Sequence, residues 1–272
     1  MSQTTLQAAL ARTKAEGRAA LIGYLPAGFP DPDSSIKVIE AMVAGGCDVV
    51  EVGLPYSDPT MDGPTIQRAA DTALAAGTTP PDVLRVVEAT AATGAAALVM
   101  TYWNPVERYG PQRFCADLAA AGGAGVITPD LIPEEAGDWF AATDAAGLDR
   151  VFLVAPSSSD ERLRLTARAS RGFVYAASLM GVTGTRAQVS GTAEKLVART
   201  RDAIGGGALP VCVGLGISTR SQAAEVAAYA DGVIAGAGFC QRVLDAPDLE
   251  TGISAVRSFA EELALGVRAG RC

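Results

Sequence analysis

The sequence predicts an α/β fold, a (β/α)8 TIM barrel of eight parallel strands with an extra N-terminal helix. Short apolar segments alternate eight times with longer, Ala-rich amphipathic segments. The apolar segments are nearly continuous, which is typical of parallel strands buried on both faces. The 272 residues suit a barrel of roughly 250 residues, and no linker divides them. We therefore expect residues 1–272 to form a single barrel domain, with an open doubly wound sheet as the alternative.

Each element follows from its residue pattern. Residues 1–20 are amphipathic and lack the apolar core of a signal peptide, so they predict the extra helix. The expected strands are apolar and often β-branched, and they cover residues 20–28, 48–55, 97–103, 125–130, 150–156, 173–178, 209–217 and 229–238. The expected helices are amphipathic, several with Asp or Ser at the start and Gly at the end, and cover residues 33–46, 78–94, 111–123, 133–147, 160–170, 192–206, 219–229 and 248–270.

Composition excludes several classes of function. A net charge of −8 disfavours nucleic-acid binding, which requires a basic surface. No apolar segment reaches the roughly 18 to 20 residues of a membrane span. The five cysteines are widely spaced, which is typical of reduced thiols in a cytoplasmic protein. The chain has no histidine, and its three lysines all lie in expected helices, so acid–base chemistry is expected from carboxylates or tyrosines.

The segment "DVVEVGLPYSDPTMDGPTIQ" places a carboxylate inside an apolar strand. Strand alternation puts Val49, Glu51 and Gly53 on one face, and Val50 and Val52 on the other. If the first set points inward, Glu51 lies near the top of the barrel lumen, where burial raises a carboxyl pKa. Such a group suits proton transfer near neutrality. The alternative is a structural carboxylate that is satisfied by the backbone or by water.

A second carboxylate, Asp62, lies in the breaker-rich loop after that strand and can lean over the same opening. On its own, "DGP" is ordinary turn chemistry. Gly-rich segments also follow the last three expected strands, at residues 181–185, 214–218 and 236–238. Their N–H groups would converge at one end of a barrel and favour a phosphate site, although each could simply close a tight turn.

Several segments together resemble the tryptophan synthase alpha subunit family. They are "YLPAGFP", "EVGLPYSDPTMDGPTIQ", "MGVTG", "GLGIS" and "ADGVIAGAG", which occur in order over nearly the whole chain. The resemblance implies a (β/α)8 barrel that acts as a lyase, cleaving indole-3-glycerol phosphate to indole and D-glyceraldehyde 3-phosphate. It also implies an alpha-beta-beta-alpha heterotetramer, in which the beta subunit makes L-tryptophan from indole and L-serine. Pyridoxal phosphate is expected only in the beta subunit, and no cofactor or metal in this chain.

The resemblance also implies roles for individual residues. The catalytic pair falls on Glu51 and Asp62, and the aspartate that couples the subunits falls on Asp58. The loops at residues 55–59 and 129–135 belong to the face that meets the beta subunit. The remaining positions bind substrate: Tyr175 at the ring, Thr183 on a mobile loop, and Gly184, Gly216, Gly236 and Ala237 at the phosphate. Family members often have serine where this chain has Ala237, which retains the N–H and lacks the hydroxyl.

The indole ring requires an apolar slot. Candidates at strand ends, supported by the family pattern, are Tyr24, Ile66, Tyr102, Tyr175, Leu215 and Ile234. Each of them, taken singly, is better explained as an ordinary residue of the hydrophobic core.

The implied chemistry agrees with the residues available. Breaking a C–C bond beside a hydroxyl requires an electron sink, and an indole ring protonated at C3 can serve as one. We expect Glu51 to shuttle the proton to C3, with Glu51 also the candidate acceptor of the hydroxyl proton. Asp62 stays ionised and accepts the indole N–H. Two other classes remain open: a non-catalytic activator of a partner, and another phosphate-binding barrel such as a sugar-phosphate isomerase.

Overall fold

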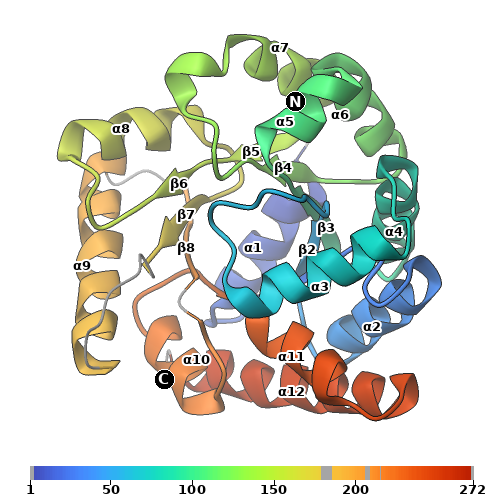
Figure 1. Cartoon of the computed structure of the whole chain (residues 1–272). Coiled ribbons are helices and arrows are strands. Elements are labelled where there is room, and N and C mark those ends of the chain that lie inside the picture. The colour runs from blue at the N-terminus through green and yellow to red at the C-terminus, as the bar shows by residue number, and fades with distance from the viewer. Residues whose placement is uncertain (1–2, 179–185, 206–208, 215, 271–272) are drawn as a thin grey trace.

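A computed structural model describes residues 3–178, 186–205, 209–214 and 216–270. Within them, strands form a ring that is surrounded by helices (Figure 1). The strands are β1 (Ala20–Pro26), β2 (Val49–Gly53), β3 (Ala96–Met100), β4 (Gly125–Ile127), β5 (Asp149–Val151), β6 (Leu153–Val154), β7 (Val174–Ala177), β8 (Val211–Gly214) and β9 (Gly232–Ala235). Every recorded strand pair is parallel, which confirms the expected fold class.

The helices of the described residues lie outside this ring, apart from α1. They are α1 (Thr5–Ala15), α2 (Pro32–Ala44), α3 (Pro64–Ala75), α4 (Pro80–Ala92), α5 (Trp103–Tyr109), α6 (Pro111–Ala120), α7 (Gly137–Ala146), α8 (Asp160–Ala169), α9 (Arg186–Ile204), α10 (Arg220–Ala227), α11 (Ala237–Asp245) and α12 (Leu249–Ala269), with a 3-10 turn η1 at Pro133–Glu135. No helix in the described part of the chain is long and apolar enough to cross a membrane.

The expected fifth strand is divided in two, and this division closes the barrel. β5 pairs with β4, whereas β6 pairs with β7. Phe152 alone separates β5 from β6. The first and last strands of the sheet, β5 and β6, are therefore parts of one continuous segment. The hydrogen bonding of this segment passes from β4 to β7 at Phe152. The backbone carbonyl of Phe152 already accepts the N–H of Tyr175, at 3.1 Å.

Three helices, α3, α5 and α11, were not expected, and in two cases the sequence analysis extended a strand too far. The segment expected as a strand at 97–103 ends at Met100, and α5 begins at Trp103. Likewise β9 ends at Ala235 and α11 begins at Ala237. Apolar residues continue past the strand ends because side chains over the barrel mouth are also buried. α3 begins at Pro64, a residue favoured in a first helical turn.

The core has an inner and an outer part. Inside the barrel, Ile22, Val49 and Leu98 pack together with Leu6 and Leu10 of α1. Val50 and Val52 belong instead to the larger cluster between strands and outer helices. The alternation expected for β2 is therefore confirmed, and Glu51 shares the inward face with Val49. The extra N-terminal helix closes the lower end of the barrel.

A buried ion pair lies directly beside this plug. Asp48, which precedes β2, accepts hydrogen bonds from Arg18 at 2.7 and 2.8 Å and from Arg12 at 2.9 Å. Its carboxylate also accepts the N–H of Leu21, at 3.0 Å. Burial alone would raise the pKa of Asp48, but the bonds from Arg18, Leu21 and Arg12 outweigh it, so the pKa lies below its ordinary value.

We expect Asp48→Asn to lower the free energy of unfolding by about 3 kcal/mol at pH 7, because Arg18 would lose its buried counter-charge. The native pKa of Asp48 is depressed, so its contribution is fully present above the unfolded-state pKa and is lost as the pH falls through the native pKa. Urea denaturation of the wild type and the variant between pH 7 and pH 3.5 measures this contribution. The difference between their free energies of unfolding should be constant down to about pH 4.5 and should then shrink.

Asp33→Asn is the matched control. Asp33 pairs with Arg85 at 2.7 Å, but its side chain is 76% exposed. An exposed pair of this kind contributes at most about 1 kcal/mol. Equal losses for the two variants would contradict a special role for the buried pair.

Candidate active site

Glu51 is the most unusual carboxyl group in the barrel. It is 1% exposed, and neither carboxyl oxygen has a hydrogen-bond partner among the described residues. Tyr24 and Leu98 flank it in register on the neighbouring strands. Burial raises its pKa to about 8, because ionisation here would leave a charge in an apolar surrounding. At neutral pH the group is therefore a neutral acid that can donate a proton.

Two tyrosines approach Glu51 across the upper lumen. Burial, followed by the charge of Asp62 in one case and of Glu51 in the other, raises the pKa of Tyr24 and Tyr175 well above the ordinary value. Glycines make room for both rings. A Cβ atom at Gly53 would lie 2.5 Å from the Tyr24 hydroxyl, and one at Gly214 would lie 2.4 Å from the Tyr175 hydroxyl. Both glycines stand at strand ends; Gly214 was expected only as part of a phosphate-binding segment, and making room for a tyrosine ring was expected of neither.

Asp62 lies on the loop between β2 and α3. Burial raises its pKa and the nearby Tyr102 hydroxyl lowers it, with burial the larger effect. Its backbone carbonyl accepts a bond from Gln67 at 2.8 Å. The charges of Glu51 and Asp62 both raise the pKa of Tyr24 and of Tyr175, so the two carboxyl groups lie in the same region of the structure.

The other residues expected to line the indole slot do not all lie in one cluster. Tyr102 is buried after β3, and Ile234 belongs to the inner cluster of the barrel. Ile66 of α3 is half-buried and packs against the outer cluster, which also contains Tyr24. Thr183, Gly184 and Leu215 lie outside the described residues.

The described phosphate candidates lie after β8 and β9. Gly216 has a φ of +60°, a left-handed conformation that favours glycine. Gly236 is the N-cap of α11, and a Cβ atom there would lie 3.1 Å from the Tyr24 ring. Ala237 is the first residue of α11, where backbone N–H groups lack acceptors within the helix. These positions can offer N–H groups and the positive end of a helix to an anion.

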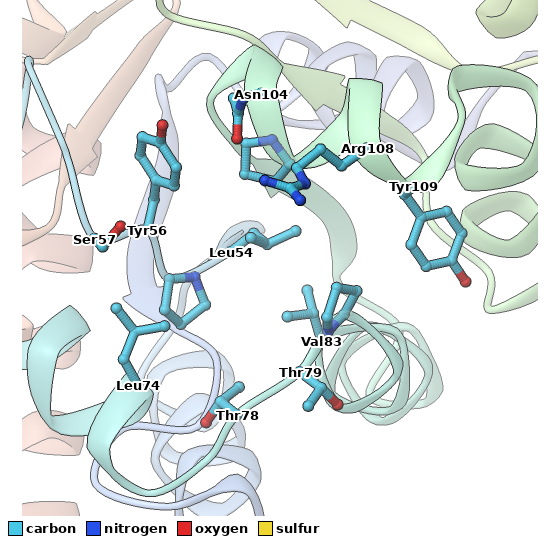
Figure 2. Close-up of a pocket in the computed structure, with 13 residues that line it drawn as sticks. Leu54, Tyr56, Ser57, Leu74, Thr78, Thr79, Val83, Asn104, Arg108 and Tyr109 are labelled. Atoms are coloured by element: carbon cyan, nitrogen blue, oxygen red, sulfur yellow. The ribbon is translucent and has the colours of Figure 1, made fainter.

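The loop with Asp58 borders a separate hollow of about 470 Å³. Figure 2 shows Tyr56 and Ser57 on one side of it, Arg108 and Tyr109 of α5 on the other, and Leu54 between them. Neither Glu51 nor Asp62 lines this hollow, so it lies on the outer side of the loop. Asp58 itself is exposed and accepts a hydrogen bond from the Ser57 hydroxyl within the same loop.

Comparison with known proteins agrees with this geometry. The sequence profile of the family described as "Tryptophan synthase alpha chain" matches residues 10–268. The tryptophan synthase alpha chain of Thermobifida fusca is 72% identical over 266 residues, which cover 98% of each chain. That of Acidothermus cellulolyticus is 60% identical over 265 residues, with 97% of each chain covered.

Solved structures give the same result. A structure of Mycobacterium tuberculosis tryptophan synthase has a TM-score of 0.90 at 52% identity, with 98% of this chain and 99% of that chain covered. The alpha subunit from Legionella pneumophila str. Paris has a TM-score of 0.88 at 30% identity, with 98% and 99% covered. The profile match, the identities and the shared barrel lead to one conclusion: this chain belongs to the tryptophan synthase alpha chain family.

Proposed function

We propose that Glu51 and Asp62 carry out, in this chain, the lyase reaction of the tryptophan synthase alpha family. That reaction cleaves indole-3-glycerol phosphate to indole and D-glyceraldehyde 3-phosphate. The observation that supports these roles best is Glu51 itself, a buried acid on the inward face of β2 with a raised pKa. Burying a carboxyl group without a hydrogen-bond partner among the described residues costs stability, so its presence in the barrel lumen favours a chemical role over a structural one.

The cleavage can be written so that protons and electrons balance. Neutral Glu51 donates its proton to C3 of the indole ring, which becomes an indolenine cation. Asp62, as the carboxylate, accepts a hydrogen bond from the ring N–H and stabilises the positive charge. The glycerol hydroxyl then loses its proton to the Glu51 carboxylate, the bond to C3 breaks, and its electrons return to the ring. Indole and the aldehyde leave, and Glu51 is neutral again.

Substrate binding divides between two regions. Tyr24, Ile66, Tyr102, Tyr175 and Ile234 would enclose the ring, with Leu215 completing the slot. Gly216, Gly236 and Ala237 would hold the phosphate through backbone N–H groups, together with Thr183 and Gly184. Ala237 has no hydroxyl, so the N-terminus of α11 would contribute the main attraction for the phosphate.

Family membership implies a beta-subunit partner, and we propose that the two form an alpha-beta-beta-alpha heterotetramer. The loops at 55–59 and 129–135 would form the contact. Met61 and Ile132, which lie beside or within these loops, are 42% and 43% exposed. Exposed apolar side chains at a loop face are typical of a surface that another protein covers. Within this assembly the chain would act in the cytoplasm as one barrel domain, without a cofactor of its own; pyridoxal phosphate would belong to the beta subunit.

Spectrophotometric detection of indole, with and without beta subunit, tests the function directly. Release of indole from indole-3-glycerol phosphate supports it. A non-catalytic activator would release no indole yet stimulate the beta subunit, and a sugar-phosphate isomerase would convert its substrate without indole.

Glu51→Gln should reduce turnover by several orders of magnitude, because an amide cannot donate and regain the proton. In the wild type, the basic limb of the pH profile should fall near pH 8, where Glu51 ionises. The variant should retain the wild-type circular dichroism spectrum. An unchanged kcat would remove Glu51 from the mechanism.

The same variant should be more stable than the wild type at neutral pH. Because the native pKa of Glu51 is raised, its contribution to the free energy of unfolding is fully present below the unfolded-state pKa of 4.5. That contribution is lost as the pH rises towards the native pKa of about 8. The stability difference in urea should therefore grow with pH, by up to about 1.4 kcal/mol per unit. A difference independent of pH would show that Glu51 ionises normally.

Asp62→Asn should lower kcat at least about a hundredfold, with a small change in KM, because the lost charge acts on the developing cation. Phosphate affinity, measured by inhibition with inorganic phosphate, should stay near the wild-type value. A large rise in KM with normal kcat would indicate a role in binding instead.

Asp58→Ala should weaken activation by the beta subunit more than basal cleavage. Its recorded hydrogen bond stays within its own loop, and its side chain is exposed on the proposed contact face. Indole release at increasing beta-subunit concentration measures both quantities. Equal losses would favour the simpler interpretation, in which Asp58 only caps its own turn.

A further inference from the structure

The loop that carries Asp62 has little of its own to hold it in place. It runs from Leu54 to Gly63 between β2 and α3, and most of its residues from Ser57 onward are exposed or half-buried. Catalysis nevertheless requires a charged group to be placed within a fraction of an ångström of its target. The contacts that position Asp62 must therefore come largely from elsewhere in the fold.

Tyr102 supplies two such contacts through one oxygen atom. The phenol oxygen accepts the backbone N–H of Met61 at 3.0 Å. The same hydroxyl lies close enough to the carboxylate of Asp62 to lower its pKa. Its ring also packs against Tyr56, with centroids 5.3 Å apart. Tyr102 thus contacts the loop at its beginning, at the residue before Asp62, and at Asp62 itself.

The backbone on the two sides of Tyr102 is bonded to β4 and to the loop that follows β4. The N–H of Thr101 donates to the carbonyl of Ile127 at 3.0 Å. The N–H of Trp103 donates to both carboxylate oxygens of Asp130, at 2.9 and 3.1 Å. The Trp103 ring then meets Trp139 edge to face, at 5.5 Å. The phenol therefore projects from a backbone that is bonded on both sides, whereas the loop that it holds has few bonds of its own.

We propose that Tyr102 is a positioning residue that acts through Asp62: its hydroxyl, which is hydrogen-bonded to Met61, holds the loop so that the Asp62 carboxylate stays in place, while Asp130 anchors the backbone next to Tyr102. This inference rests on the proposed function, since it requires Asp62 to stabilise a cation. It differs from the role expected for Tyr102 from the sequence, which was only to line the ring slot.

The charges around Asp62 support this inference. The charge of Asp62 acts on Tyr24, Tyr175 and Cys240, and burial raises the pKa of these three groups and of Glu51. All are therefore mainly neutral at pH 7. Burial also raises the pKa of Asp62, and the Tyr102 hydroxyl lowers it. Without that hydroxyl, Asp62 would hold its proton to higher pH.

Tyr102→Phe tests the proposal, because it removes the hydroxyl and keeps the ring. We expect kcat for indole release to fall roughly ten- to hundredfold, the effect of losing a polar contact with a charged group, with KM within about threefold. The acid limb of the pH profile should move to higher pH, while the basic limb assigned to Glu51 stays in place. Unchanged kcat and an unmoved acid limb would overturn the proposal.

Tyr109→Phe is the matched control. Its hydroxyl also lies beside an aspartate, Asp117, to which it donates a hydrogen bond at 2.7 Å, but on the outer helices α5 and α6. This variant should leave kcat and the pH profile unchanged. A double variant separates positioning from general structural support: adding Tyr102→Phe to Asp62→Asn should cause almost no further loss. A fully additive loss would show that Tyr102 acts independently of Asp62, which would also overturn the proposal.

Two further measurements keep the result interpretable. If Tyr102→Phe fails to fold, Asp130→Asn can be used instead, because it retains the phenol and weakens its anchor. This variant should lower kcat at least threefold and shift the acid limb to higher pH. An unchanged kcat and pH profile would refute the inference. Wild type and Asp62→Asn serve as the reference. If the wild type releases no indole, or Asp62→Asn keeps its kcat, the proposed function itself fails, independently of Tyr102.

Discussion

A carboxyl group that is sealed inside an apolar barrel is the constraint on which the rest of this structure depends. Glu51 is almost without exposure and has no recorded hydrogen-bond partner in the described residues, so its neutral form is favoured. The surrounding architecture preserves this condition. Tyr24 and Tyr175 narrow the lumen above it, and Gly53 and Gly214 are small enough to let those rings stand close to the wall.

The lower end of the barrel contributes to the same effect. Leu6 and Leu10 of α1 pack into the inner cluster beneath Val49, and water is thereby excluded from the N-terminal side. Polar groups hold this plug at its margins: Arg12 of α1 joins Arg18 at Asp48, and Gln7 donates to Asp149 at 2.7 Å. Structural ion pairs thus occupy one end of the barrel, and the chemically useful acid lies toward the other, as is usual in TIM barrels.

Local periodicity explains what could be predicted. The inward direction of Glu51 follows from the strict alternation of a strand, and the closed parallel ring follows from the alternation of apolar and amphipathic segments. Contacts between distant segments could not be predicted in this way, because they leave no periodic pattern in the sequence. The bond between Met61 and Tyr102 joins residues 41 positions apart, and nothing in the local pattern of either indicates it. Helices α5 and α11 were missed for the related reason that apolar residues over the barrel mouth resemble strand residues. The catalytic and binding roles stay predictions, since they concern a substrate.

The two carboxyl groups of the site are therefore held by different means, and this difference bears on regulation. Glu51 belongs to a central strand with neighbours on both sides, so its position follows from the whole barrel and can change only if the barrel changes. Asp62 belongs to a loop that is bonded to β3 at its first residue, Leu54, to the Tyr102 phenol through Met61, and to α3 through Gln67. A partner that binds the outer face of this loop would meet Tyr56 and Ser57, only a few residues from Asp62. Control by a second subunit would thus act on the placement of Asp62 at a small energetic cost, whereas Glu51, the acid proposed to start the reaction, is held by its strand.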